Sequence, residues 1–425
     1  MQQRGFVGRG LLAFWVLVAV LAFAAPVQAK DVWPHEISDL KPDPTVRFGV
    51  LPNGLRYAIK PNANPQGTVT VRIRIAAGSL HENENELGVA HFLEHMAFNG
   101  SAKYPEGEMF KALQRLGVQI GSSANASTDF DNTTFALSLP SVRADTLDVG
   151  FNILREIVGR LTLSAEAIDR ERGVILSEER ARDTPGMRAN LAQLHAMFAG
   201  QKYPHRFPIG KLEFIKRAGP AELRSFYERH YRPERSLLVV AGDVDPARME
   251  AKIAAVFGDW SQPGPAAPAE DFGTPAKRGL VAAHTVQPGL EESVTLSWIQ
   301  PEDTRPDKKA RRNEISQRIV AFTVLNRRLS KLARQADAPF IDARVAREVV
   351  QGGGIVTAMT VRTRAGEWAK GLQAAEQELR RALTHGLQQE EVSREALEQK
   401  SPYLLMAANA KTRSNIEMAD WLLMT

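Results

Sequence analysis

The pentapeptide His91-Phe-Leu-Glu94-His95 constrains this chain more than any other feature of its sequence. If the segment is a helix, the two histidines lie one turn apart on the same face, where both imidazoles can reach one metal ion. Glu94 then lies beside them and can accept a proton from a metal-bound water. Apolar residues around the pentapeptide recur at helical spacing, which favours the helix. The alternative is a half-buried helix that carries two ordinary histidines.

A catalytic zinc site normally takes three protein ligands and one water, so a further ligand is required. The chain has no Cys, which leaves His, Asp or Glu. The charged segment Ala167–Arg182 is predicted to form an amphipathic helix on which Glu171 and Glu178 lie two turns apart, on nearly the same face. One carboxylate can bind the metal while the other orients a ligand. Alternatively, both are solvated surface carboxylates.

Two segments together indicate a family. Gly88–Gly100, which contains the pentapeptide, and Glu171–Glu178 closely resemble the pitrilysin/insulinase family of inverted-motif zinc metallopeptidases. The resemblance extends over most of the chain and is strongest between residues 78 and 179. It implies an enzyme that hydrolyses peptide bonds with the help of zinc.

The resemblance also assigns roles to individual residues. It implies that His91, His95 and Glu178 bind one Zn²⁺ per chain, that Glu94 is the general base, and that Glu171 supports the site from the second shell. Nitrogen and oxygen ligands favour zinc, although manganese or cobalt can often occupy such a set.

A third matching segment contains Asn125 and Ala126. In the family, this Asn-Ala pair begins an edge strand that pairs with the main chain of the substrate. An unpaired strand edge can hold an extended peptide with little preference for its side chains. Asn125 could instead be a turn residue, because its surroundings are also typical of a loop. We expect the strand, with Asn125 and Ala126 as substrate-binding residues.

The N-terminus has the pattern of a secretory signal peptide. Arg4 and Arg9 precede an apolar run, Leu11–Ala25, and small residues lead to a predicted cleavage after Ala29. The run has 15 residues, fewer than the roughly 20 that a spanning helix needs. The mature chain is therefore expected to be periplasmic or secreted, without a stable membrane span. The alternative is an uncleaved N-terminal membrane anchor.

Composition excludes some classes of function. The formal charge is +5, and it falls to +3 when Arg4 and Arg9 leave with the signal peptide, which contains no acidic residue. Positive and negative residues are mixed along the chain, so no nucleic-acid partner is expected. Hydrophobic residues make up 44% of the chain, enough for two globular cores.

The order of predicted elements indicates an α+β fold with an antiparallel-rich sheet packed by helices. Strand, helix and strand patterns recur in a similar order in the second part of the chain, which suggests two related α/β roll domains. The predicted divisions are a signal peptide at 1–29, a catalytic zinc-binding domain at 30–260, a Pro-rich linker at 261–279 and a second, non-catalytic domain at 280–425.

The leading hypothesis is an exported zinc endopeptidase that cuts short or unfolded polypeptides. The family resemblance implies a second pitrilysin-like half, either a C-terminal continuation or a partner subunit, that closes a chamber over the zinc. The chain is therefore expected to be one such half, incomplete at its C-terminus. The alternative is a non-catalytic peptide-binding or scaffold subunit of a two-part peptidase assembly.

Overall fold

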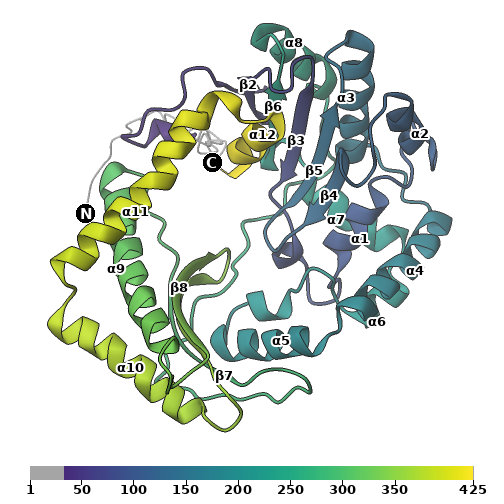
Figure 1. Cartoon of the computed structure of the whole chain (residues 1–425). Helices are drawn as coiled ribbons and strands as arrows, with labels where there is room; N and C mark the ends of the chain where they lie inside the picture. Colours follow the sequence, from purple (N-terminus) through teal and green to yellow (C-terminus); the bar gives the residue numbers. More distant parts are fainter. Residues whose placement is uncertain (1–32, 425) are drawn as a thin grey trace, which may run out of the picture.

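The computed structural model describes residues 33–424 (Figure 1). The predicted signal peptide at 1–29 lies outside the described residues. Between residues 33 and 424, none of the helices combines the length and the hydropathy that a membrane crossing requires.

A six-stranded sheet forms the centre of the first part of the chain. Its strands are β1 (Arg47–Val50), β2 (Arg56–Pro61), β3 (Val69–Ile75), β4 (Ala124–Thr128), β5 (Thr133–Leu139) and β6 (Ser236–Gly242). Their spatial order is β1-β2-β6-β3-β5-β4, and every neighbouring pair is antiparallel except β2 and β6. All seven residues of β6 are buried, as expected for an apolar strand covered on both faces.

Helices cover one face of this sheet. The helices of this part are α1 (Val89–Met96), α2 (Glu108–Arg115), α3 (Ala144–Gly159), α4 (Ala165–Arg182), α5 (Pro185–Met197), α6 (Leu212–Arg217), α7 (Pro220–His230) and α8 (Pro246–Phe257). Short 3₁₀ turns lie at η1 (Pro34–Glu36), η2 (Ser79–His81), η3 (Tyr203–His205) and η4 (Pro233–Arg235). Val69, Val71, Ile73 and Ile75 of β3 point into the core beneath these helices, because alternate side chains of a strand face the same side.

A three-stranded antiparallel sheet forms the second part of the chain. Its strands are β7 (Ser293–Gln300), β8 (Asp342–Val350) and β9 (Gly354–Arg362), in the order β7-β9-β8. The helices of this part are α9 (Lys309–Ala333), α10 (Trp368–His385), α11 (Gln389–Ala408) and α12 (Asn415–Met424), with a 3₁₀ turn at η5 (Asn409–Thr412). A separate core joins Leu325 and Leu329 of α9 to Met359 and Val361 of β9. This architecture confirms the predicted α+β class with an antiparallel-rich sheet.

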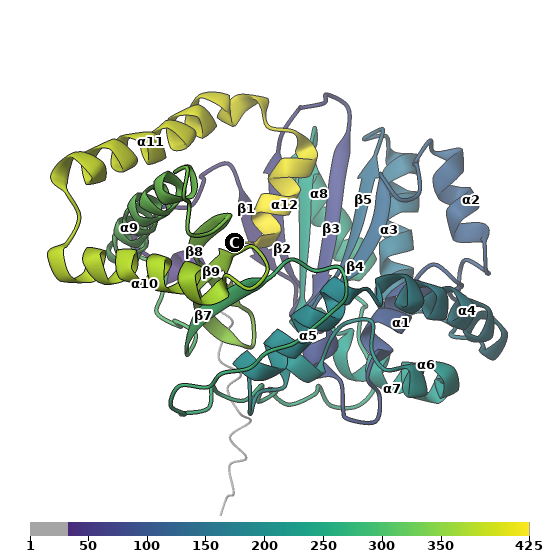
Figure 2. The same ribbon diagram turned by 60° about the horizontal axis from the view of Figure 1, so that its bottom comes forward.

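The C-terminal helix α12 packs on the first sheet rather than on the second. Met418, Ala419 and Leu423 meet Leu237 and Val239 of β6 on the face opposite the other helices. Figure 2 shows α11 running from the layer of α9 and α10 toward α12, which lies beside the strands of the first sheet. The division at 261–279 stays a prediction, but the segment from 415 onward contacts the first sheet.

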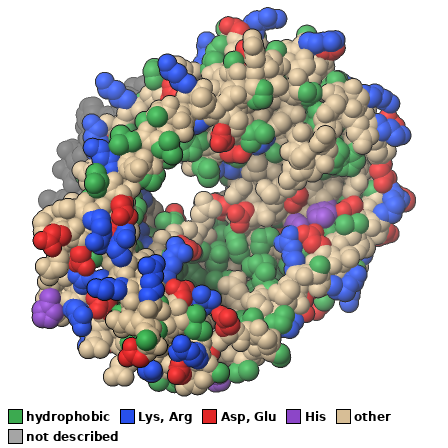
Figure 3. All heavy atoms as spheres, viewed as in Figure 1, with side chains coloured by type: hydrophobic (Ala, Val, Ile, Leu, Met, Phe, Trp, Pro, Cys, Tyr) green, Lys and Arg blue, Asp and Glu red, His purple; other side chains and the backbone are tan. Residues whose placement is uncertain are grey.

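The two sheets and their helices enclose a hollow. In Figure 3, the molecule forms a ring around a central opening, with hydrophobic side chains gathered inside the hollow. Helix α11 closes one side of this ring in Figure 1.

Candidate metal centre

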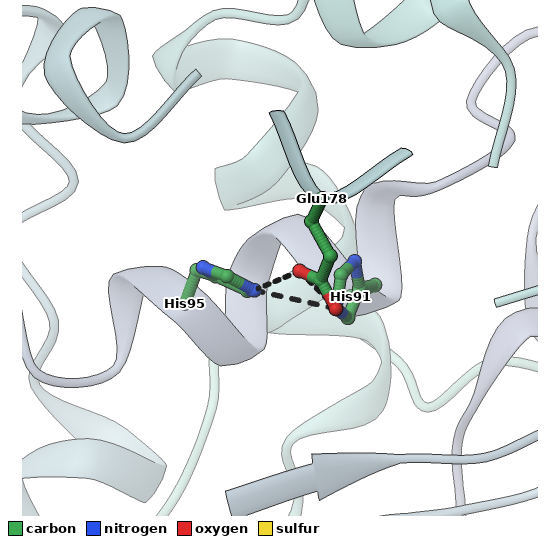
Figure 4. Close-up of side chains that lie close together, drawn as sticks. All are labelled: His91, His95 and Glu178. Atoms are coloured by element: carbon green, nitrogen blue, oxygen red, sulfur yellow. Dashed lines mark hydrogen bonds and ion pairs between the residues drawn. The ribbon is translucent and has the colours of Figure 1, made fainter. Parts of the chain in front are cut away.

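Helix α1 presents the pentapeptide from a buried position. Its apolar residues Val89, Phe92 and Met96 are buried in the first core. His91 is also buried, whereas Glu94 and His95 are half-buried on the open side. The predicted helix is therefore present, with both histidines on one face (Figure 4).

A buried carboxylate fixes the start of α1. Glu82 accepts hydrogen bonds from the backbone N–H groups of Gly88 (2.8 Å) and Ala90 (3.0 Å), which have no partner within the helix. Burial raises the pKa of Glu82 to about 8, and these two N–H donors oppose the shift. Gly88 has a φ of 107°, and a Cβ there would lie 3.0 Å from the Cα of Gly210. Only glycine suits this backbone.

Helix α4 brings the two predicted glutamates over α1. Ser164 caps its start by accepting a hydrogen bond from the Ala167 N–H (3.3 Å). Ile168 and Ile175 are buried on its inner side. Glu171 and Glu178 project from this helix toward His95 and, for Glu178, also toward His91.

Three side-chain atoms converge in the geometry of a zinc site. His91 Nε2 and His95 Nε2 are 3.3 Å apart. Glu178 Oε2 lies 3.3 Å from His95 Nε2 and 3.7 Å from His91 Nε2 (Figure 4). Tetrahedral zinc with ligands at 2.0–2.1 Å separates its ligand atoms by about 3.3 Å. The three atoms therefore fit three corners of such a site, and a fourth corner is left for water or substrate. Among residues 33–424, no other three His, Asp or Glu side chains bring potential ligand atoms this close.

Glu171 and Arg182 orient His95 and Glu178 by contacts to the atoms that point away from the cluster. Glu171 Oε1 lies 2.7 Å from His95 Nδ1, and Asn99 donates a hydrogen bond of 2.9 Å to Glu171 Oε2. This contact places the His95 proton on Nδ1 and leaves Nε2 free to bind a metal. Arg182 donates to Glu178 Oε1, so Oε2 is the oxygen that faces the histidines.

The protonation of the histidines differs. Burial, with the neighbouring His95, lowers the pKa of His91 to about 4, so its imidazole is neutral at neutral pH. Burial acts in the same direction on His95, but its hydrogen bond to Glu171 and the nearby carboxylates raise its pKa overall. At a pH where His95 carries a second proton, that proton lies on Nε2 and competes with a metal for this atom.

Glu94 lies beside the cluster without joining it. Thr128 Oγ1, at the end of β4, donates a hydrogen bond of 3.1 Å to Glu94 Oε2. Burial raises the pKa of Glu94. The other oxygen, Oε1, is thus available to exchange a proton with a group on the open side.

Asn125 and Ala126 lie in β4, the outer strand of the first sheet. Strand β5 pairs with one edge of β4. On the other edge, the described residues form only an isolated bridge between Ile120 and Ala124. The segment is therefore a strand, not a simple turn, and it leads along the chain to Thr128 beside Glu94.

A pocket of about 160 Å³ adjoins the cluster of His91, His95 and Glu178, because Arg182 both lines the pocket and donates a hydrogen bond to Glu178. It lies between the end of α4, α5 and the segment 204–211. Its apolar lining residues are Leu87, Met187, Leu191, Pro204, Phe207 and Ile209. The sequence did not single out Arg182 or this pocket. The i, i+4 spacing of Glu178 and Arg182 could have indicated their contact, but pairs with this spacing are common on exposed helices and do not mark a site.

Models of two protein-domain families match the chain. Residues 57–204, which contain all the converging side chains, match "Insulinase (Peptidase family M16)", and residues 218–397 match "Peptidase M16 inactive domain". The chain belongs to the M16 peptidase family. This confirms the resemblance to pitrilysin and insulinase.

Several M16 relatives are similar in sequence. The probable zinc protease PqqL of Haemophilus influenzae is 37% identical over 218 residues, which are 51% of this chain and 23% of that protein. PqqL of Escherichia coli is 37% identical over 240 residues, which are 56% and 26% of the two chains. The matched region is thus about a quarter of each relative.

Solved structures of M16 proteins share the fold. The crystal structure of the periplasmic protease PqqL from E. coli superposes with a TM-score of 0.82 at 26% identity, covering 91% of this chain and 42% of that one. The crystal structure of pitrilysin gives a TM-score of 0.60 at 19% identity, covering 83% and 38%, and it shows the fold alone. The chain spans less than half the length of both proteins.

Proposed function

We propose that this chain is the metal-binding half of an exported zinc endopeptidase that hydrolyses peptide bonds in short or unfolded polypeptides. The observation that carries the proposal is the convergence of His91, His95 and Glu178, with Glu94 beside them. A zinc ion held there would polarise the scissile carbonyl and lower the pKa of its bound water. The relatives named zinc proteases support the choice of metal and of reaction.

Glu94 is the proposed general base. Burial moves the pKa of Glu94 toward neutral pH, where a group can both accept a proton and return it. Thr128 holds Oε2, so Oε1 takes the proton of the attacking water and passes it to the leaving amine. Glu171 and Arg182 keep the ligand atoms oriented through this cycle.

The proposed substrate lies along β4. A peptide that adds as a strand beside Asn125 and Ala126 would run toward Thr128 and therefore toward Glu94. Main-chain pairing of this kind suits substrates that are short or unfolded, because a folded segment has no free backbone to offer. The pocket beside Arg182 is lined by apolar side chains and by an equal number of charged or histidine side chains, which suits a substrate side chain with both an apolar and a polar part.

Export and a second half complete the proposal. The signal-peptide pattern at 1–29, with cleavage after Ala29, predicts a periplasmic or secreted protein, and the similar PqqL of E. coli is a periplasmic protease. Because the chain covers 42% of that relative, we propose a second M16-like half, as a continuation or a partner subunit, that faces the metal centre.

The variant Glu94→Gln tests the proposal. In the full-length protein, hydrolysis of a quenched peptide should fall by roughly 10²–10⁴-fold, because an amide cannot accept the water proton. The zinc content, measured by inductively coupled plasma mass spectrometry, should stay at one zinc ion per chain. The matched control Glu108→Gln, on α2, where the carboxylate pairs with Lys111 and not with the histidines, should keep full activity. A chelator should abolish activity, and added zinc should restore it.

Retained turnover in Glu94→Gln, or loss of its zinc, would contradict these roles. The alternative function is a non-catalytic peptide-binding or scaffold subunit, and the match of residues 218–397 to an M16 inactive domain is the observation in its favour. Under that alternative, the full-length protein would bind the quenched peptide without cleaving it, whether or not zinc is present.

A further inference from the structure

Helix α7 is followed directly by a buried tyrosine, Tyr231. The residue is 0% exposed. Its ring packs against those of Phe135 and Tyr227, at centroid distances of 6.2 and 4.9 Å. Its hydroxyl is also buried, and it makes no hydrogen bond with any group among residues 33–424. Because burial of a hydroxyl without a partner is costly, this group requires an explanation.

The strand on which Tyr231 packs leads to Glu94. Phe135 and Thr133 are two positions apart on β5, so their side chains face the same side of the sheet, and both are buried. Thr133 is paired directly with Thr128 of β4, which places the Thr128 side chain on that side as well. The Thr128 hydroxyl donates to Glu94 Oε2 at 3.1 Å. Tyr231 therefore packs on the part of the sheet that holds Glu94.

The charge of Glu94 acts on the Tyr231 hydroxyl. Burial raises the pKa of Tyr231 well above its usual range, and the Glu94 carboxylate adds to the increase. The Thr133 hydroxyl, which lies near enough to lower this pKa, donates its own proton to the carbonyl of Ala77 (2.9 Å). The Tyr231 hydroxyl thus keeps its proton at neutral pH, and the acidic side chain that acts on it is Glu94.

The neighbouring Tyr227 has a hydroxyl with a clear structural role. It lies one helical turn earlier and is 1% exposed. Its hydroxyl donates to the carbonyl of Ile157 (2.8 Å) and accepts from the N–H of Leu161 (3.4 Å), so it joins α7 to the end of α3. Tyr231 has no such contact in the described part of the chain. Packing between helices therefore explains the hydroxyl of Tyr227 but not that of Tyr231.

We propose that Tyr231 is a positioning residue for Glu94. Its O–H dipole would attract Oε2 of the carboxylate from within the core, while Thr128 holds the same oxygen from β4. Oε1 is then kept on the open side, where the proposed reaction takes place. Such an attraction acts without direct contact, because the effective dielectric constant of a protein interior is low. The inference rests on the proposed function, since it requires Glu94 to act as the base.

The variant Tyr231→Phe tests the inference, because it removes the hydroxyl and keeps the ring. In the full-length protein with zinc, kcat for a quenched peptide should fall by about 3- to 30-fold. KM and zinc content should not change, because the variant alters neither β4 nor the metal ligands. The urea midpoint should stay the same or rise, since the hydroxyl has no partner to lose among residues 33–424. An unchanged kcat would overturn the proposal.

Tyr227→Phe is the matched control, because it removes a hydroxyl from an equally buried ring on the same helix. It should lower the urea midpoint, since two hydrogen bonds are lost, and it should keep the kcat of the wild type. A purely structural role of Tyr231 would give this same pattern in Tyr231→Phe. That result, or a fall in kcat that only follows a loss of bound zinc, would overturn the proposal.

Combination with Thr128→Val gives an independent readout. If Tyr231 and Thr128 act on the same oxygen of Glu94, their effects on kcat are not independent. The kcat of the double variant should differ by at least about threefold from the product of the two single effects. Effects that simply multiply would overturn the proposal. Absence of turnover in the wild-type protein would instead refute the proposed function, and this inference would fall with it.

Discussion

Each carboxylate of the metal centre has a distinct task that its neighbours impose. Glu178 divides its two oxygens between the histidines and Arg182, while Glu171 holds the ring of His95 and is itself held by Asn99. If the cluster binds a metal as proposed, these outer contacts would fix the ligand atoms beforehand and so lower the cost of binding.

Glu171→Gln should weaken zinc binding by roughly 10- to 100-fold, because an amide oxygen holds the His95 Nδ1–H less strongly than a carboxylate does. Without that carboxylate, the pKa of His95 should also fall, so protons should compete with zinc only at lower pH. Competition with a fluorescent zinc chelator between pH 5 and 8 measures both effects.

The control for this experiment is Glu166→Gln, an exposed glutamate in the first turn of the same helix. It should leave zinc affinity unchanged. If Glu171→Gln binds zinc as tightly as the wild type at every pH, Glu171 does not orient His95.

At the scale of secondary structure, α1 depends on a residue that precedes it. Glu82 is 2% exposed and accepts from two N–H groups at the start of the helix that carries His91 and His95. Both N–H groups belong to the N-terminal end of the helix, where such groups have no partner within the helix. The position of α1, and so of both histidines, is tied to this contact.

Glu82→Ala should lower the free energy of unfolding by about 1–3 kcal/mol, because two buried N–H groups lose their partner. Glu82→Gln, which keeps one acceptor oxygen, should lose about half as much. Urea denaturation of the metal-free protein measures the change. Zinc affinity should fall in the same order, and equal stability of wild type and Glu82→Ala would exclude the capping role.

A second contact between elements is sensitive to acid. His81 of η2 and His230 of α7 lie with ring centroids 5.7 Å apart. Burial, with the positive Arg235 nearby, lowers the pKa of His81 to about 4 and that of His230 to about 2. Between about pH 4 and pH 6.5, both imidazoles are therefore neutral in the folded chain, whereas in the unfolded chain they are protonated.

Because only the unfolded chain takes up these protons, stability should fall as pH drops below about 6.5, by about 2 kcal/mol per histidine at pH 5. Removal of one titrating group, in His230→Gln, should reduce the loss between pH 7 and pH 5 by that amount. Urea denaturation at the two pH values measures it. His385→Gln, exposed on α10, should leave the loss as in wild type, and an unchanged loss in His230→Gln would contradict the assignment.

At the scale of the whole molecule, the turn between β8 and β9 joins the two parts of the chain. Gly352 has a φ of 69°, and a Cβ there would lie 2.5 Å from Leu80 and 3.1 Å from Phe272. Gln201 donates a hydrogen bond of 2.7 Å to the carbonyl of Gly353. Glycine is needed here because the turn lies directly against the first part of the chain.

Gly352→Val should destabilise the protein by about 1–3 kcal/mol, since the added side chain overlaps Leu80 and strains the backbone. Gly173→Ala, where nothing lies within 4 Å, should instead raise stability by about 0.5–1 kcal/mol, because alanine favours the interior of α4. Thermal unfolding of both variants gives the comparison. A neutral effect of Gly352→Val would mean that the turn does not press on the first part.

The sequence by itself determined the elements that follow from local pattern. Alternation along 69–75 and helical spacing around His91 predict a strand and a helix that the structure contains, because side-chain periodicity is a local property. The α+β class followed from the order of such elements. The spacing of Glu171 and Glu178 predicted a shared face, and only the family resemblance assigned Glu178 to the metal.

Only the tertiary structure decided what meets across distance in the chain. The packing of α12 on the first sheet depends on segments that are remote in sequence, and the role of Arg182 depends on a charge pair that is common on helix surfaces. Glu82 lies only six residues before Gly88, but its role as a cap depends on how the irregular loop between them folds back. Local pattern does not encode which surfaces meet, because that choice depends on how the apolar faces of all the elements are buried together.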